Sequence, residues 1–120
     1  MRIKAEIWVK AYIRRCSSNG APAVIARCGQ GDGGAIFIKI NSLDGTVTLY
    51  GPAPAGLDAS SYDRLWVPCL GEGAVNEADA DSYLLRQAEF DPDIWIIEVE
   101  DREGRHFLGD ALADNQGHMT

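Results

Sequence analysis

The chain has 120 residues and a mass of 13.0 kDa, with 46% of the residues hydrophobic and 24% charged. This size and composition are those of one globular domain, and they exclude multidomain enzymes, collagen-like chains and wholly disordered chains. The net charge of -7 argues against a surface devoted to nucleic acid or to an anionic membrane.

The charge is unevenly distributed along the chain. Residues 1–40 carry seven basic and two acidic side chains, whereas residues 41–120 carry four basic and sixteen acidic ones. Such asymmetry indicates either a basic docking patch or an attraction between the two halves of one small fold. The sequence leaves both interpretations open.

Features of secreted and membrane proteins are missing from the sequence. Charged residues interrupt the first ten positions, so there is no apolar core of a signal peptide, and no run approaches the length of a spanning helix. Cys16, Cys28 and Cys69 are odd in number and widely spaced, which indicates neither a disulfide framework nor a zinc site. We therefore expect a protein of the reducing cytoplasm with no membrane partner.

The first predicted element is a helix over residues 5–18, because apolar side chains recur there at helical spacing. Gly20 and Pro22 then end it. Residues 3–9 also alternate in a way that fits a strand, so the start of the helix stays open.

Short runs rich in β-branched and aromatic residues predict the strands. Asp44-Gly45 is a strong hairpin signal, and the glycine-rich residues 29–34 are interpreted as a second, flexible hairpin loop. The aperiodic residues 51–63 predict a surface loop. The six predicted strands are residues 23–28, 35–40, 46–50, 65–70, 94–100 and 105–108.

A second helix is predicted from the N-cap Asn76 to about Phe90, where Asp91-Pro92 ends it. The last two strands form a hairpin that would bring Arg105 to Glu100. The order α-β-β-β-β-α-β-β predicts an α+β fold with both helices packed on one face of a mainly antiparallel sheet. We expect one domain over residues 1–108 and a flexible tail at residues 109–120.

The glycine-rich residues 29–34 do not fit a phosphate-binding loop. A strand rather than a helix follows them, and no Gly-Lys-Ser or Gly-Lys-Thr ends the segment. We therefore expect no nucleotide, and the sequence predicts no other cofactor and no metal.

His106 and the pair of Glu98 and Glu100 are the candidates for acid-base chemistry. Glu98 and Glu100 lie two apart on a predicted strand and so share a face. A small enzyme that uses His106 with Glu98 or Glu100 is therefore an alternative, with no reaction specified. A half-buried histidine and a solvated pair of glutamates explain the same residues, and we assign no catalytic residue.

Two features point to binding instead. Lys10, Arg14 and Arg15 give the first helix a basic face, and Ile7 falls on the same side. Trp66 follows the long loop on a predicted edge strand, where aromatic anchors of interfaces are common. Placement of Trp66 in the core is the competing interpretation.

Three segments resemble a known family. They are AEIWVKAYIRRC at residues 5–16, GAIFIK at residues 34–39 and FDPDIWIIEVEDREGRHF at residues 90–107. Together they resemble the alphaproteobacterial domain-of-unknown-function family 1491, over about residues 1–108. The resemblance implies a compact intracellular bacterial protein without an established activity. Members are sometimes labelled GTP-binding, but the residues for that chemistry are missing here, and the family supplies no catalytic residues.

These observations together predict a small cytoplasmic binding or interaction module. Its docking surface is expected on the basic face of the first helix, with Lys10, Arg14, Arg15 and Trp66 as the candidate binding residues. A protein partner or a second copy of the chain is the expected class of partner. Nucleic acid is an alternative that the overall charge disfavours.

Overall fold

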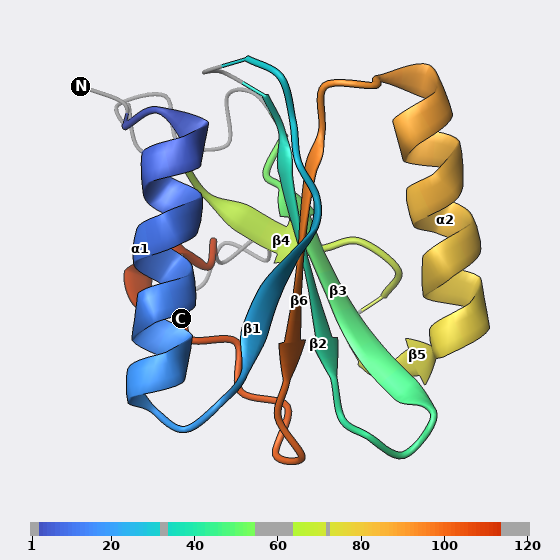
Figure 1. Cartoon of the computed structure of the whole chain (residues 1–120). Helices are drawn as coiled ribbons and strands as arrows, with labels where there is room; N and C mark the ends of the chain where they lie inside the picture. Colours follow the sequence, from blue (N-terminus) through green and yellow to red (C-terminus); the bar gives the residue numbers. More distant parts are fainter. Residues whose placement is uncertain (1–2, 32–33, 55–63, 72, 114–120) are drawn as a thin grey trace.

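The computed structural model describes residues 3–31, 34–54, 64–71 and 73–113. Within these ranges the chain forms two α-helices, six strands and one short 3-10 helix (Figure 1). In chain order they are α1 (Ala5–Ser18), β1 (Ala23–Arg27), β2 (Ile36–Asn41), β3 (Thr46–Pro52), β4 (Trp66–Pro68), β5 (Val75–Asn76), α2 (Glu77–Phe90), β6 (Trp95–Glu100) and η1 (Gly109–Ala111).

Both helices have the predicted bounds. α1 buries residues three or four positions apart, namely Ala5, Val9, Tyr12 and Cys16, so helical periodicity prevails over the alternation of residues 3–9. Asn76 occupies the N-cap position of α2, but its side chain makes no capping hydrogen bond. The two helices were predictable because their signals are local in the sequence.

The strands form one mixed sheet in the order β1-β6-β2-β3-β4, with β5 paired to β3. Only β2 and β6 run parallel, whereas the other described pairs are antiparallel, so the predicted α+β class with a mainly antiparallel sheet is confirmed. The hairpin at Asp44-Gly45 is also confirmed, with Gly45 at φ 90° and the Asp44 carboxylate accepting the N–H of Thr46 at 3.0 Å.

The two helices lie on opposite faces of this sheet, as Figure 1 shows. Along β2, Ile36, Ile38 and Ile40 pack in one core with α1, whereas Phe37 packs in a second core with α2. Successive side chains of a strand point to opposite faces, and all six residues of β2 are buried. The expectation that both helices share one face was therefore wrong.

The predicted last strand at residues 105–108 does not form. The carboxylate of Asp101 accepts the backbone N–H of Arg105 at 2.7 Å and its guanidinium at 2.8 Å, and Phe107 has a φ of 55°. A positive φ breaks an extended backbone, so the chain curls away from β6. Arg105 consequently pairs with Asp101 and not with Glu100, which corrects that expectation.

The chain continues along the sheet edge after this turn. Leu108 is buried, and the N–H of Ala113 donates to the carbonyl of Trp66 at 2.8 Å. Leu112 and Ala113 of the expected tail thus pair with Trp66 of β4. Residues 114–120 lie outside the described residues, as do residues 55–63 of the expected long loop.

Neither described helix is long and apolar enough to cross a membrane. The three cysteines are free thiols, with Cys16 buried, Cys69 partly buried and Cys28 exposed. Burial raises the pKa of Cys69 to about 11, which leaves that thiol protonated and unreactive at neutral pH.

Candidate functional site

The glycine-rich loop does not connect neighbouring strands. Because β6 lies between β1 and β2, the loop crosses the start of β6, and the hairpin interpretation of residues 29–34 was wrong. The backbone N–H groups of Gln30 and Gly31 donate to one carboxylate oxygen of Asp93. The amides that a phosphate would use at these two residues therefore bind a carboxylate of the chain itself.

A buried lysine forms the most highly charged cluster among the described residues. Lys39 is 5% exposed on the α2 face of β2, and its Nζ lies 2.8 Å from Glu77, 2.8 Å from Asp81 and 3.8 Å from Glu98. Burial acts to lower the pKa of Lys39, but the hydrogen bonds to Asp81 and Glu77 and the charge of Glu98 outweigh it and raise the pKa. The ammonium is therefore held charged at neutral pH.

Asn41 extends this cluster along β2. Its amide nitrogen donates to Glu98 at 3.2 Å, and its oxygen accepts the N–H of Leu43 at 2.8 Å. The cluster joins one basic residue of the first forty to three acidic residues of the later part. At Lys39, the uneven charge distribution therefore serves attraction within the fold.

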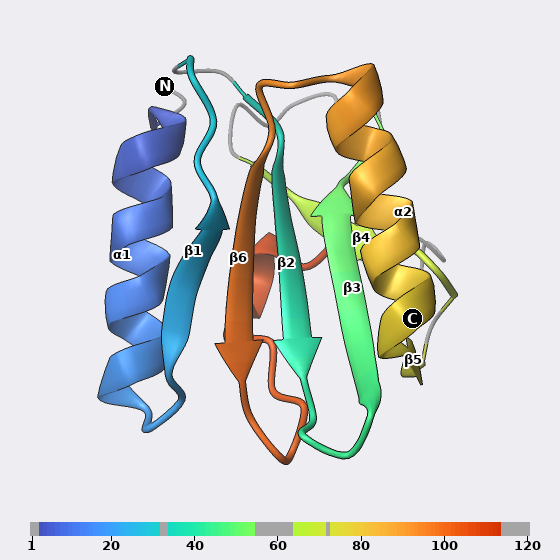
Figure 2. The same cartoon turned by 45° about the vertical axis from the view of Figure 1, so that its right-hand side comes forward.

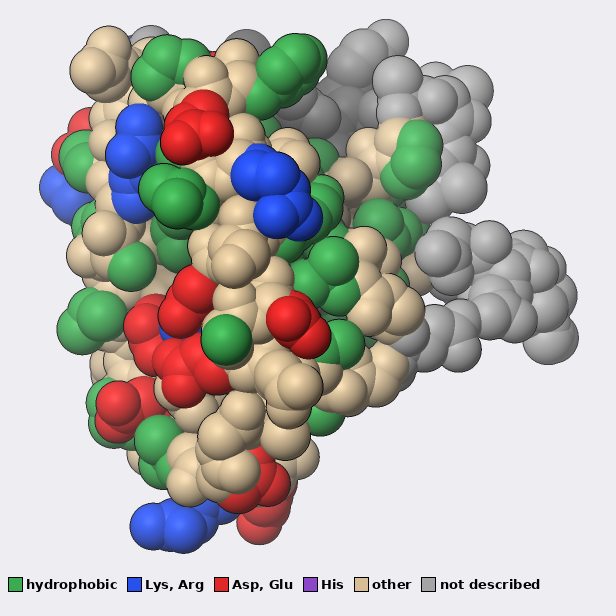
Figure 3. Space-filling view, turned by 90° about the vertical axis from the view of Figure 1, so that its right-hand side faces the viewer, with side chains coloured by type: hydrophobic (Ala, Val, Ile, Leu, Met, Phe, Trp, Pro, Cys, Tyr) green, Lys and Arg blue, Asp and Glu red, His purple; other side chains and the backbone are tan. Residues whose placement is uncertain are grey.

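A shallow groove of about 300 Å³ runs beside this cluster, between α2 and β1. In Figure 2, α2 lies over the β3 side of the sheet, and β1 lies to the side of it at the far edge. Seen from the α2 side in Figure 3, acidic side chains gather near the middle of the molecule. The groove is lined by Ala26, Arg27, Lys39, Asp81, Leu84, Leu85, Ala88, Ile96 and Glu98.

His106 lies away from the glutamates with which the sequence paired it. Its ring packs edge-on against Tyr50 at 5.6 Å, and its carbonyl accepts the hydroxyl of Tyr12 at 2.6 Å. Both tyrosines belong to the core on the α1 side, whereas Glu98 contacts Lys39 on the α2 side. The sheet separates the two, so the geometry gives the enzyme alternative no support.

The surroundings of His106 favour the neutral form of its imidazole. Nδ1 accepts the backbone N–H of Leu108 at 2.9 Å, and burial lowers the pKa of the imidazole. A neutral ring that accepts a backbone hydrogen bond is a structural element of the C-terminal turn. Within the described residues, no group of three or more His, Cys, Asp and Glu side chains is placed to hold a metal ion.

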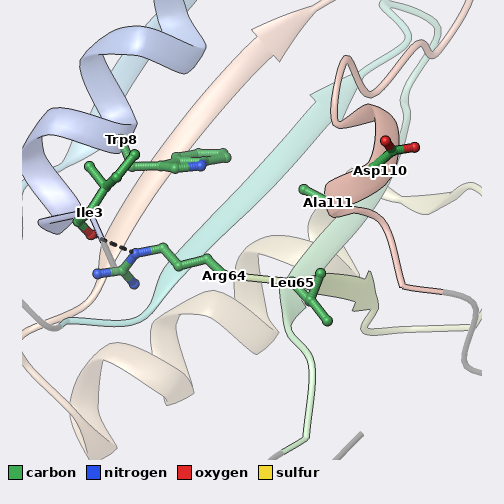
Figure 4. A pocket seen from close by; sticks show the side chains of 6 residues that line it. All are labelled: Ile3, Trp8, Arg64, Leu65, Asp110 and Ala111. Atoms are coloured by element: carbon green, nitrogen blue, oxygen red, sulfur yellow. Dashed lines mark hydrogen bonds between the residues drawn. The ribbon is translucent and has the colours of Figure 1, made fainter. Parts of the chain in front are cut away.

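Trp66 lies in the core. It is 1% exposed, its indole N–H donates to the carbonyl of Ile36 at 2.9 Å, and its ring stacks on Trp8 at 4.2 Å. A pocket of about 250 Å³ lies next to this stack (Figure 4). It is lined by Ile3, Trp8, Arg64, Leu65, Asp110 and Ala111. Trp8 and not Trp66 therefore reaches this surface, and a binding role of Trp66 stays a prediction.

The basic face of α1 is exposed. Lys10 forms an ion pair with Glu6 at 2.9 Å, and Ile7 is 57% exposed. Arg14 lies one turn after Lys10 on the same side of the helix. Arg15 lies on the flank towards the C-terminal turn, where its Nη1 donates to the carbonyl of Phe107 at 2.9 Å. Arg15 thus holds α1 to the C-terminal turn, whereas the ion pair of Lys10 lies within α1.

A family model described as a protein of unknown function (DUF1491) matches residues 3–109. The chain belongs to the DUF1491 family. The resemblance of the three sequence segments is thereby confirmed over nearly all of the described structure. No curated protein matches the chain.

Solved structures of DUF1491 proteins show the same fold. A crystal structure of a DUF1491 family protein from Caulobacter crescentus CB15 has a TM-score of 0.76 and 37% identity, and covers 95% of this chain and 100% of that one. An NMR structure of a DUF1491 family protein from the same organism has a TM-score of 0.77, 38% identity and coverage of 95% and 99%. The solution structure of a protein from A. tumefaciens has a TM-score of 0.71, 34% identity and coverage of 83% and 86%.

Sequence reasoning missed Asp93 and the cluster around Lys39. A lysine inside the apolar run at residues 36–40 was the available signal, because a buried lysine requires partners of opposite charge. The partners themselves come from α2 and β6, and no local pattern specifies which elements pack against β2.

Proposed function

We propose that this DUF1491 protein is a non-catalytic binding module that docks on an acidic protein surface through the outer face of α1. The observation that carries the proposal is Ile7, which is 57% exposed beside Lys10 on the face of α1 opposite its buried residues. A large apolar side chain flanked by cations gives both the apolar contact and the charge that an acidic partner would complement.

The same observations favour protein over nucleic acid. The basic stripe is short, since α1 has 14 residues and is about 21 Å long. The net charge is -7, so a polyanion longer than this stripe would meet repulsion from the rest of the surface. An acidic patch of limited size on a protein avoids that repulsion.

The non-catalytic character rests on the placement of the candidate acid-base groups. His106 accepts a backbone hydrogen bond on the α1 side, and Glu98 contacts Lys39 and Asn41 on the α2 side. Each group therefore has a structural partner, and the sheet separates them.

Affinity capture from a lysate of the native host tests the proposal. The test variant is Lys10→Ala/Arg14→Ala, which leaves the contact of Arg15 with Phe107 intact. The matched control is Arg86→Ala/Arg102→Ala, which removes the same charge from two exposed positions outside α1. Nuclease treatment of the lysate removes partners that are held only through nucleic acid.

We expect the wild type and the control to capture the same proteins, and the α1 variant to lose them. The captured proteins should also be released as salt is raised. The Debye length falls from about 10 Å at 0.1 M to about 3 Å at 1 M, so added salt weakens the attraction between exposed charges. Equal capture by both double variants would refute the α1 surface. Loss of all capture after nuclease treatment would favour nucleic acid instead.

We further infer that the protein works in the reducing cytoplasm. All three cysteines are free thiols, and such unpaired thiols are typical of proteins kept in a reducing compartment.

A further inference from the structure

We propose that the groove between α2 and β1 is a second docking site, and that its occupant is a basic amphipathic helix of a partner protein. This site lies on the other face of the sheet from α1 (Figure 2), and it does not depend on the function proposed for α1. Its apolar surface, its charge and its width each point to this occupant.

The apolar surface is the first observation. Leu85 on α2 lines the groove and is 63% exposed. Val24 on β1 is 60% exposed and lies beside the groove, on the same face of the sheet as its pairing partner Glu98. Between them, Ile96 of β6 forms the floor, and Ala26 and Ala88 line the two sides. Exposed apolar side chains that converge on one concave surface mark interaction sites.

The charge is the second observation. Three carboxylates, those of Glu77, Asp81 and Glu98, face the single ammonium of Lys39. Arg27 is the other cation of the groove lining, so three negative and two positive charges leave this part of the groove with a net charge of -1. Glu100, two residues further along β6, is exposed on the same side of the strand. A partner with lysine or arginine beside its apolar residues would complement this end.

The shape is the third observation. The groove is open and lies between a helix and an edge strand, above a strand of six residues that is about 20 Å long. Helices cover the faces of sheets in α+β folds, and α2 covers only part of this face. A helix about 10 Å wide packed beside α2 would cover the remainder, including Val24 and Leu85.

A defined pair of synthetic peptides tests this site on the whole protein. One is a helix-forming peptide of about 14 residues, or about 21 Å, with leucine at positions i, i+3, i+4 and i+7 and lysine on the flanks. The other carries glutamate in place of each lysine. Binding is measured by fluorescence anisotropy and located by backbone amide NMR shifts.

Two pairs of variants accompany the peptides. Leu85→Ser removes the apolar wall, and Phe90→Ser is its control, since Phe90 is 89% exposed on the same helix outside the groove lining. Asp81→Asn removes an acidic group of the groove while Glu77 and Glu98 still face Lys39. Its control is Asp79→Asn in the same helical turn.

We expect the lysine peptide to bind the wild type and to shift the amides of Val24, Leu85 and Ile96. Leu85→Ser and Asp81→Asn should each weaken binding by about tenfold, which corresponds to about 1.4 kcal/mol, and their controls should not. Equal binding of the glutamate peptide, equal binding to Leu85→Ser, or shifts outside the groove would overturn the proposal.

The Lys10→Ala/Arg14→Ala variant separates the two proposals. It should bind the lysine peptide as the wild type does, because α1 lies on the other face of the sheet. If the wild type does not bind the lysine peptide but still captures proteins through α1, the groove proposal alone is overturned.

Discussion

The carboxylate of Asp93 accepts the backbone N–H of Gly31 at 2.6 Å, and the two residues are 62 positions apart in the sequence. The same oxygen accepts the N–H of Gln30. These bonds hold the connection from β1 to β2 across the start of β6, the strand that separates them in the sheet. The glycine-rich loop thus has a structural use that needs no ligand.

Replacement of Asp93 tests this use. Asp93→Ala removes the acceptor of both amides, and we expect a loss of about 1–3 kcal/mol in the free energy of unfolding. Asp93→Asn keeps an acceptor oxygen and should lose less. Urea unfolding measures both, and amide exchange at Gln30 and Gly31 should become faster in Asp93→Ala only. Equal stability of Asp93→Ala and the wild type would contradict the account.

A side chain at Gly34 is predicted to lower the stability of the fold. A Cβ there would collide with the backbone carbonyl of Asp93, and it would also lie 3.3 Å from the carboxylate of Asp93. Because a backbone carbonyl cannot move aside as a flexible side chain does, Gly34→Ala should cost about 1–3 kcal/mol. Gly73→Ala is the control, since nothing lies within 4 Å of its Cβ position. Thermal unfolding of the two variants checks the difference, and equal midpoints would be the contrary result.

Lys39 is predicted to stabilise the contact between β2 and α2. Lys39→Met leaves the carboxylates of Glu77, Asp81 and Glu98 without their shared cation. We expect a loss of about 1–2 kcal/mol, below that of a fully buried pair, because the side chains of Glu77 and Asp81 are 38% and 56% exposed. Lys10→Met removes the exposed pair with Glu6 and should change the unfolding midpoint little. A Lys39→Met protein as stable as Lys10→Met would argue against the cluster.

His106 gives a pH dependence with a defined sign. Burial lowers its pKa from the ordinary value of 6.5, so the unfolded chain binds a proton more readily than the folded one. The contribution of His106 to the free energy of unfolding is complete above the pKa of His106 in the unfolded chain. It is lost as the pH falls from that value through the lower pKa of the folded chain. Urea unfolding between about pH 7 and pH 5 should show this loss in the wild type. His106→Asn, which keeps an acceptor for the N–H of Leu108, should show a smaller loss, and parallel profiles would be inconsistent with the assignment.

The parts of the fold that were predictable are those with local signals. The apolar period defines α1, Asp91-Pro92 ends α2, and Asp44-Gly45 forms its hairpin. The position of β6 between β1 and β2 has no such signal, because its parallel pairing with β2 joins residues far apart in the sequence. For this reason, two predictions were wrong: that both helices lie on one face, and that residues 29–34 form a hairpin loop.

The same distinction holds for the candidate sites. The basic face of α1 was predictable, because Lys10 and Arg14 lie one helical turn apart. The groove was not, because its residues come from β1, β2, α2 and β6. The positive φ of Phe107 directs the chain away from β6. No sequence signal indicated it, because residues 105–108 have the pattern of a strand.

The most direct test of the central claim is the affinity of a captured partner, once purified, for the protein and its two double variants. Isothermal titration calorimetry should give a Kd for Lys10→Ala/Arg14→Ala that is weaker than that of the wild type by about tenfold or more. The Kd of Arg86→Ala/Arg102→Ala should equal that of the wild type. An unchanged Kd for the α1 variant would contradict docking through this face.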